Sequence, residues 1–117
     1  MPRGSWGRYR TSTLVREYLL KVGKASIYET WKAVLEQLEG TKYLKPSYGN
    51  MRILFYLLKK LGLVRIVGIE KSSKKGYYDK TLYAIVRRKA KAEEWLNPYE
   101  AVYRPSAFRK RLHLTFE

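Results

Sequence analysis

Residues 47–75 read SYGNMRILFYLLKKLGLVRIVGIEKSSKK, and this stretch decides the fold. A helix over 51–61, at about 100° per residue, gathers apolar side chains into one broad arc. We expect that arc to bury Met51, Ile53, Leu54, Phe55, Leu57, Leu58 and Leu61. The opposite side is cationic and aromatic, and it carries Tyr48, Arg52, Tyr56, Lys59 and Lys60. One face therefore belongs to a core, and the other is available to a partner.

A β-hairpin is predicted to follow this helix. Gly62 can supply the left-handed residue that ends the helix, and 63–69 is rich in β-branched residues typical of a strand. Apolar residues alternate again over 81–88, as a half-buried antiparallel strand requires. The connection over 70–80 contains Ser72, Ser73 and Gly76, which suit a turn.

Two further helices are expected before this segment. Apolar residues at helical spacing predict a helix over 13–22, which Gly23 ends. Ser26 and Glu29 have the spacing of a capping box, so a second helix should run from there to about Leu38, with Trp31 in the core. The predicted order is three helices, a strand, a loop and a strand.

Both ends of the chain read as basic extended arms. Residues 1–12 place three arginines, a tryptophan and a tyrosine among Gly, Ser and Pro, a composition that does not bury a core. A short helix is expected over 90–96, followed by a second extended arm over 99–117. The predicted organisation is an N-terminal arm (1–12), one domain (13–89) and a short helix with a C-terminal arm (90–117).

The segment LFYLLKKLGLV (54–64) and the element order resemble the winged-helix family. The resemblance implies an α+β fold: three helices with a two- or three-stranded antiparallel wing. It also implies a recognition helix over 45–60 and a wing over 71–80. The chain departs from the family at the start of that helix, where SYGN (47–50) stands in place of a run of small polar residues. Asn50 and Arg52 are still chemically able to bond base edges.

Positive charge is concentrated in the second half of the chain. The whole chain has 25 Lys and Arg against 10 Asp and Glu, and residues 41–89 alone carry 13 basic and two acidic side chains, a net charge of +11. Residues 13–40 carry four of each sign. The ion-pair networks of thermophilic proteins use both signs, so they do not explain this imbalance. A scarcity of amides, one Gln and two Asn, points to a hot habitat.

Cations interleaved with aromatic rings predict nucleic-acid binding. Lys and Arg engage phosphates and release counterions, while exposed Tyr and Trp stack on unpaired bases. The predicted nucleic-acid-binding residues are Arg3, Trp6, Arg8, Tyr9, Arg10, Lys45, Tyr48, Asn50, Arg52, Tyr56, Lys59, Lys60, Lys71, Lys74, Lys75, Tyr77, Tyr78, Lys80, Arg87, Arg88, Lys89, Arg104, Arg109, Lys110 and Arg111.

Catalysis is not expected from this composition. There is no cysteine, one histidine (His113) and one aspartate (Asp79), so a nucleophile, a base and an orienting group cannot be assembled. No phosphate-binding or dinucleotide glycine motif occurs. We therefore expect no enzyme activity, metal, cofactor or small-molecule substrate. No apolar run approaches the roughly 18 residues of a membrane span, so we expect a soluble cytoplasmic protein without a membrane partner.

The partner is expected to be RNA. A compact domain with two basic, aromatic arms and a pI of about 10.1 resembles small archaeal ribosomal proteins. This resemblance implies binding to rRNA and contact with neighbouring ribosomal proteins. A winged-helix DNA-binding transcription or chromatin factor, cellular or viral, is the alternative. A protein-interaction adaptor is the third reading, against which the charge of 41–89 argues.

Overall fold

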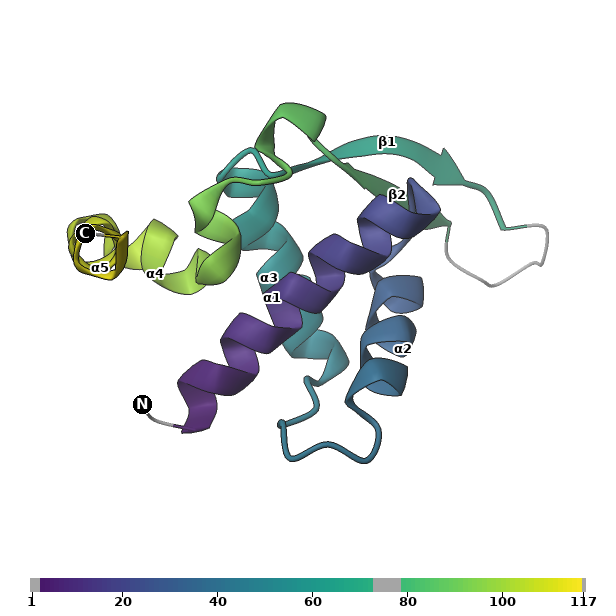
Figure 1. The fold of residues 1–117 in the computed structure, drawn as a ribbon. Coiled ribbons are helices and arrows are strands. Elements are labelled where there is room, and N and C mark those ends of the chain that lie inside the picture. The colour runs from purple at the N-terminus through teal and green to yellow at the C-terminus, as the bar shows by residue number, and fades with distance from the viewer. Residues whose placement is uncertain (1–2, 73–78, 117) are drawn as a thin grey trace.

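The computed structural model describes residues 3–72 and 79–116, with side chains described over 11–72 and 79–110. Within these residues the fold is α+β, as predicted, with five α-helices and a two-stranded antiparallel sheet (Figure 1). The elements are α1 (Arg3–Val22), α2 (Ile27–Leu38), α3 (Tyr48–Lys60), β1 (Val64–Glu70), β2 (Lys80–Ile85), the 3-10 helices η1 (Arg87–Lys89) and η2 (Glu93–Leu96), α4 (Pro98–Tyr103) and α5 (Pro105–Phe116). No helix of the described chain has the length and apolar character to span a membrane.

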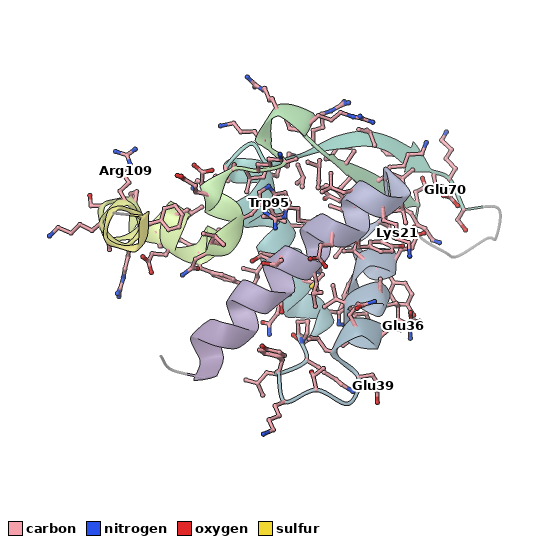
Figure 2. The ribbon with its side chains drawn as sticks, in the orientation of Figure 1. Lys21, Glu36, Glu39, Glu70, Trp95 and Arg109 are labelled. Atoms are coloured by element: carbon pink, nitrogen blue, oxygen red, sulfur yellow. The ribbon has the colours of Figure 1, made fainter. Side chains whose placement is uncertain are left out.

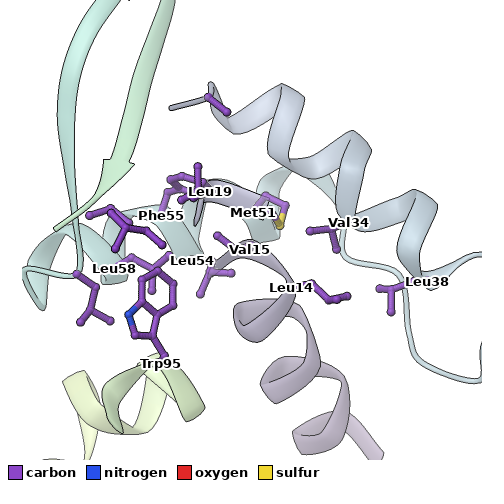
Figure 3. Packing of buried hydrophobic residues seen from close by; sticks show 14 residues of the cluster. Leu14, Val15, Leu19, Val34, Leu38, Met51, Leu54, Phe55, Leu58 and Trp95 are labelled. Atoms are coloured by element: carbon purple, nitrogen blue, oxygen red, sulfur yellow. The ribbon is translucent and has the colours of Figure 1, made fainter. Parts of the chain in front are cut away.

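The hydrophobic core lies where α1, α2 and α3 meet (Figure 3). Each helix contributes its apolar stripe, and side chains from both strands close one end of the core. The core residues labelled in Figure 3 are Leu14, Val15, Leu19, Val34, Leu38, Met51, Leu54, Phe55, Leu58 and Trp95.

The predicted capping box starts α2. The Ser26 hydroxyl accepts from the Glu29 amide at 3.2 Å, and the Glu29 carboxylate accepts from the Ser26 amide at 3.3 Å. Just before this cap, Ala25 exchanges two backbone hydrogen bonds with Tyr83, at 3.0 and 2.8 Å. This isolated antiparallel bridge joins the start of α2 to the edge of the sheet.

Gly62 ends α3 as predicted, with a φ of +75°. The Leu63 amide donates to the Leu58 carbonyl at 2.9 Å, and the Gly62 amide donates to the Lys59 carbonyl at 3.0 Å. These two bonds form a Schellman motif, and its usual apolar contact is available because Leu58 and Leu63 are both fully buried. The motif fixes where α3 stops and β1 begins.

The predicted hairpin is present, with slightly different bounds. Its register runs from Val64 opposite Ile85 to Glu70 opposite Lys80, and a bulge at Val67 interrupts the ladder. A bulge bends and twists a hairpin, so the burial along β1 does not alternate cleanly. The prediction that residues 86–88 continue the second strand is wrong. β2 ends at Ile85, and η1 carries Arg87, Arg88 and Lys89 instead.

The predicted extended arms are wrong, because both ends of the chain are helical. α1 begins at Arg3, ten residues before the expected start, and Thr11 and Ser12 are buried. Residues 98–103 and 105–116 form α4 and α5, and the Phe108 side chain of α5 is buried. Pro98 and Pro105 begin these helices, where a missing amide hydrogen costs nothing. Residues 90–96, expected to be a helix, form a turn and the 3-10 helix η2.

Trp95 of η2 connects the C-terminal part of the chain to the core. Its side chain is fully buried, and its indole nitrogen donates to the Lys89 carbonyl at 2.9 Å. Its own carbonyl accepts from the buried Ser12 hydroxyl of α1 at 2.8 Å. The middle of α1 and the segment after β2 therefore hold each other in place.

Replacing Trp95 with Ala should lower the free energy of unfolding by about 3–5 kcal/mol, because a large cavity would open in the core. The neighbouring Leu96→Ala change removes a 41% exposed side chain and should cost less than about 0.5 kcal/mol. Urea unfolding followed by far-UV circular dichroism measures both. If both variants lost equally little free energy of unfolding, the role of Trp95 in the core would be contradicted.

Candidate nucleic-acid interface

The outer face of α3 is exposed, basic and aromatic, as the sequence predicts. Tyr48, Arg52, Tyr56, Lys59 and Lys60 all lie on it. Residues 48–60 contain no Asp or Glu, so no acid of the helix itself offsets these cations. The expectation that Ile53 is buried is wrong. It is 49% exposed, because its position on the helix lies toward Tyr56 and Lys60 rather than toward the buried arc.

An aromatic cluster lies at the start of this face. The ring centroids of Tyr28, Trp31 and Tyr48 are 5.8 Å (Tyr28 to Trp31), 5.5 Å (Trp31 to Tyr48) and 6.2 Å (Tyr28 to Tyr48) apart. Trp31 packs partly buried against the core, and its indole nitrogen donates to the Pro46 carbonyl at 2.8 Å. Sequence reasoning did not select Tyr28. The signal was its position three residues before Trp31, which places both rings on one face of α2.

The C-terminal end of α3 lies close to η1. The Val86 amide donates to the Leu63 carbonyl at 2.9 Å, so the end of β2 is tied to the residue just before β1. Arg87 and Arg88, which follow Val86, are exposed, as are Lys59 and Lys60 at the end of α3. Figure 2 shows nitrogen-tipped side chains pointing outward from the sheet and the turn after it. The structure thus ties the backbone just before η1 to the stretch that follows α3.

The Lys60 ammonium nitrogen lies 5.9 Å from the centroid of the Tyr56 ring. That distance is within the range of a cation–π contact at an exposed site. Lys89, which follows Arg88, is half-buried, and its carbonyl is the acceptor for the Trp95 indole. The backbone of η1 is therefore anchored to the core while Arg87 and Arg88 face solvent.

The far end of the hairpin carries two more exposed candidates, Lys71 and Lys80. Lys80 lies opposite Glu70 in the strand register. The Ser72 amide donates a hydrogen bond to an Asp79 carboxylate oxygen at 2.8 Å. The two acids of the segment 41–89 thus both lie at this end of the hairpin. The remaining predicted wing residues, Lys74, Lys75, Tyr77 and Tyr78, lie outside the described residues.

Lys45 forms an ion pair with Glu39. Its ammonium lies 2.9 Å from the Glu39 carboxylate, and this hydrogen bond, with the attraction between the charges, lowers the pKa of Glu39. Lys45 also precedes α3, whose N-cap is Ser47, so the expected helical start at residue 45 is wrong. Asn50 is exposed, and its amide donates to the Ser47 hydroxyl at 3.1 Å.

A second basic region lies on the far side of the molecule. Arg104, Arg109 and Lys110 are exposed at and in α5, and Figure 1 places α5 at the opposite side from the end of the hairpin. The longest dimension of the molecule is 53 Å. Arg111 lies in α5, and Arg3, Trp6, Arg8, Tyr9 and Arg10 lie in the first half of α1, but their side chains are outside the described set. The candidate residues therefore do not form one continuous surface.

A cavity of about 240 Å³ lies between α1 and α2, away from these cations. Glu17, Lys21 and Glu36 line it together with Tyr18. Burial raises the pKa of Tyr18, and the charges of Glu29 and Glu36 raise it further.

No group of three or more His, Asp or Glu side chains suited to a metal ion occurs in the described part of the chain.

Comparison with protein-family models, with curated proteins and with solved structures finds no match for this chain.

Tyr18 should titrate above the usual tyrosine pKa of about 10. The fold favours the neutral phenol, so this contribution to stability is complete below about pH 10 and is lost as the pH rises through the folded-state pKa. Glu36→Gln should bring the pKa of Tyr18 only part of the way back, because burial is the larger cause. A ¹³C NMR titration of labelled tyrosine measures this. A full return to the usual value would show that charge, and not burial, dominates.

Proposed function

We propose that this chain is a non-catalytic RNA-binding protein with a winged-helix arrangement, and that it is a structural, rRNA-binding component of the cytoplasmic ribosome of a thermophilic archaeon. The observation that carries the proposal is the outer face of α3, which is exposed and basic and contains no acid. A sugar-phosphate backbone is the partner whose charge complements such a surface.

The order of elements supports the winged-helix part of the proposal. α2 and α3 are consecutive helices, and α3 leads directly into the β1–β2 hairpin. The Ala25–Tyr83 bridge adds the stretch before α2 to the edge of that hairpin. In such an arrangement α3 is the helix that faces nucleic acid and the hairpin is the wing.

The distribution of charge favours structured RNA over a single DNA site. Exposed cations lie at the hairpin and at α5, on opposite sides of a molecule 53 Å long. Two separated basic regions allow one protein to contact two nucleic-acid segments and to offset the repulsion between them. Neighbouring ribosomal proteins would be further partners in this setting.

DNA binding remains the second candidate, because Asn50 and Arg52 are both exposed in the first turns of α3. These side chains can form hydrogen bonds with base edges in a major groove. A DNA-binding factor would protect a short duplex from cleavage, as a dimer on a site with two-fold symmetry.

Sedimentation of tagged protein from a native lysate separates these functions. A ribosomal protein should travel with one ribosomal subunit in a low-magnesium gradient and remain there in moderate salt. Protein that stays at the top of the gradient and footprints a DNA duplex would contradict the proposal and support the alternative.

Binding to RNA should weaken steeply with salt. If eight to ten phosphates are contacted, the affinity should fall by roughly three to five orders of magnitude between 50 and 200 mM salt. Replacing Lys60 with Ala should reduce the slope of log affinity against log salt by about 0.7–0.9. Fluorescence anisotropy with labelled rRNA fragments measures the slope.

Lys21→Ala is the matched control, because Lys21 is an exposed lysine in the last turn of α1, as Lys60 is in α3. Lys21 lines the cavity that also contains Glu17 and Glu36, so its removal should leave the slope unchanged. Equal slopes for Lys60→Ala and the unaltered protein would show that Lys60 contacts no phosphate, and would contradict the assignment of α3 to the interface.

A further inference from the structure

The rings of Tyr28, Trp31 and Tyr48 pack against one another, and the cluster is partly open to solvent. Tyr28 is 50% exposed and Tyr48 is 40% exposed, although both contact another ring. Trp31 packs partly buried against the core, and its indole nitrogen donates a hydrogen bond to the Pro46 carbonyl. The side-chain caps of Ser26 and Ser47 fix the first turns of α2 and α3, from which the two tyrosines project.

The cluster continues into a line of alternating rings and cations along α3. Tyr48, Arg52, Tyr56 and Lys60 follow one another at intervals of four residues, and side chains four apart are neighbours on a helix surface. All four are exposed. The exposed Ile53 adds apolar surface on the same side.

This chemistry suits a nucleotide that offers the face of its base and its phosphate together. Bases in a duplex stack on each other, so their faces are not available to a protein ring. An unpaired strand offers both groups, and aromatic side chains beside a basic groove are the usual means of binding it. At the start of α3, where a duplex reader needs polar groups for base edges, this chain instead places ring surface beside Asn50.

We propose that the surface formed by Tyr28, Trp31, Tyr48, Arg52, Tyr56 and Lys60 binds an unpaired RNA segment. Bases stack on the tyrosine rings, and the phosphates contact Arg52 and Lys60. The inference rests on the proposed function, since it names the form of RNA that this face of the protein recognises.

The decisive test uses the unaltered protein and three labelled probes of equal length at low salt. The first is a single-stranded RNA, the second is the same strand with abasic sites at its central positions, and the third is the duplex. Each stacked base should strengthen binding by about 5-fold to 150-fold, so the abasic strand should bind more weakly by at least that factor. Equal affinity for the abasic and the complete strand would overturn the inference.

Two variants locate the stacking. Tyr28→Ala and Tyr48→Ala should each weaken binding of the complete strand, by about 5-fold or more, and leave binding of the abasic strand unchanged. Tyr28→Phe and Tyr48→Phe keep the rings and should bind as the unaltered protein does. Tyr103→Ala removes a tyrosine of α4 that is 65% exposed and should change nothing. If an alanine variant does not fold, the affinities of the unaltered protein for the abasic and the complete strand still test whether bases stack on the protein.

The outcomes separate the inference from the proposed function. Salt-sensitive binding that is equal for all three probes would overturn stacking and leave RNA binding through charge intact. No binding to any probe at low salt would overturn both.

Discussion

The burial of Trp95 against α1 and α3 is the contact on which the rest of the structure depends. Its indole is buried in the core, and the ring nitrogen donates a hydrogen bond to the Lys89 carbonyl. Its backbone carbonyl accepts a hydrogen bond from the Ser12 hydroxyl. The segment after β2 is thereby anchored in the core, and η1 is tied to it through the Lys89 carbonyl. On the outer arc of α3, Tyr48 packs against Tyr28 and Trp31 of α2, and the residues that follow, Arg52, Tyr56, Lys59 and Lys60, are exposed to solvent.

That surface belongs to a helix that carries cations and no acid of its own. Lys59 and Lys60 lie in the last turn of α3, whereas acids of the helical part, such as Glu17 and Glu36, lie at the cavity between α1 and α2. Repulsion among like charges lowers the stability of the folded state. A polyanion on this face reverses that effect, because each phosphate it brings replaces repulsion with attraction and releases counterions.

Local signals in the sequence predicted the elements that have local causes. The capping box at Ser26, the glycine stop at Gly62 and the exposed side of α3 were all predictable from a few adjacent residues. The helical ends were not predictable, because Gly, Ser and Pro in 1–12 indicate coil, whereas the partner of Ser12 lies 83 residues away. The spacing of Tyr28 from Trp31 was visible in the sequence, but its contact with Tyr48 joins two helices across the linker and could not be predicted from local residues.

The central claim is that the outer face of α3, with η1, is the surface that meets RNA. Backbone amide shifts recorded by ¹⁵N NMR during titration with a single-stranded RNA test it residue by residue. The account predicts the largest changes at Tyr48, Arg52, Tyr56 and Lys60, followed by Arg87 and Arg88, with α1 near Tyr18 unaffected. Changes confined to the cavity between α1 and α2, or to α5 alone, would contradict it.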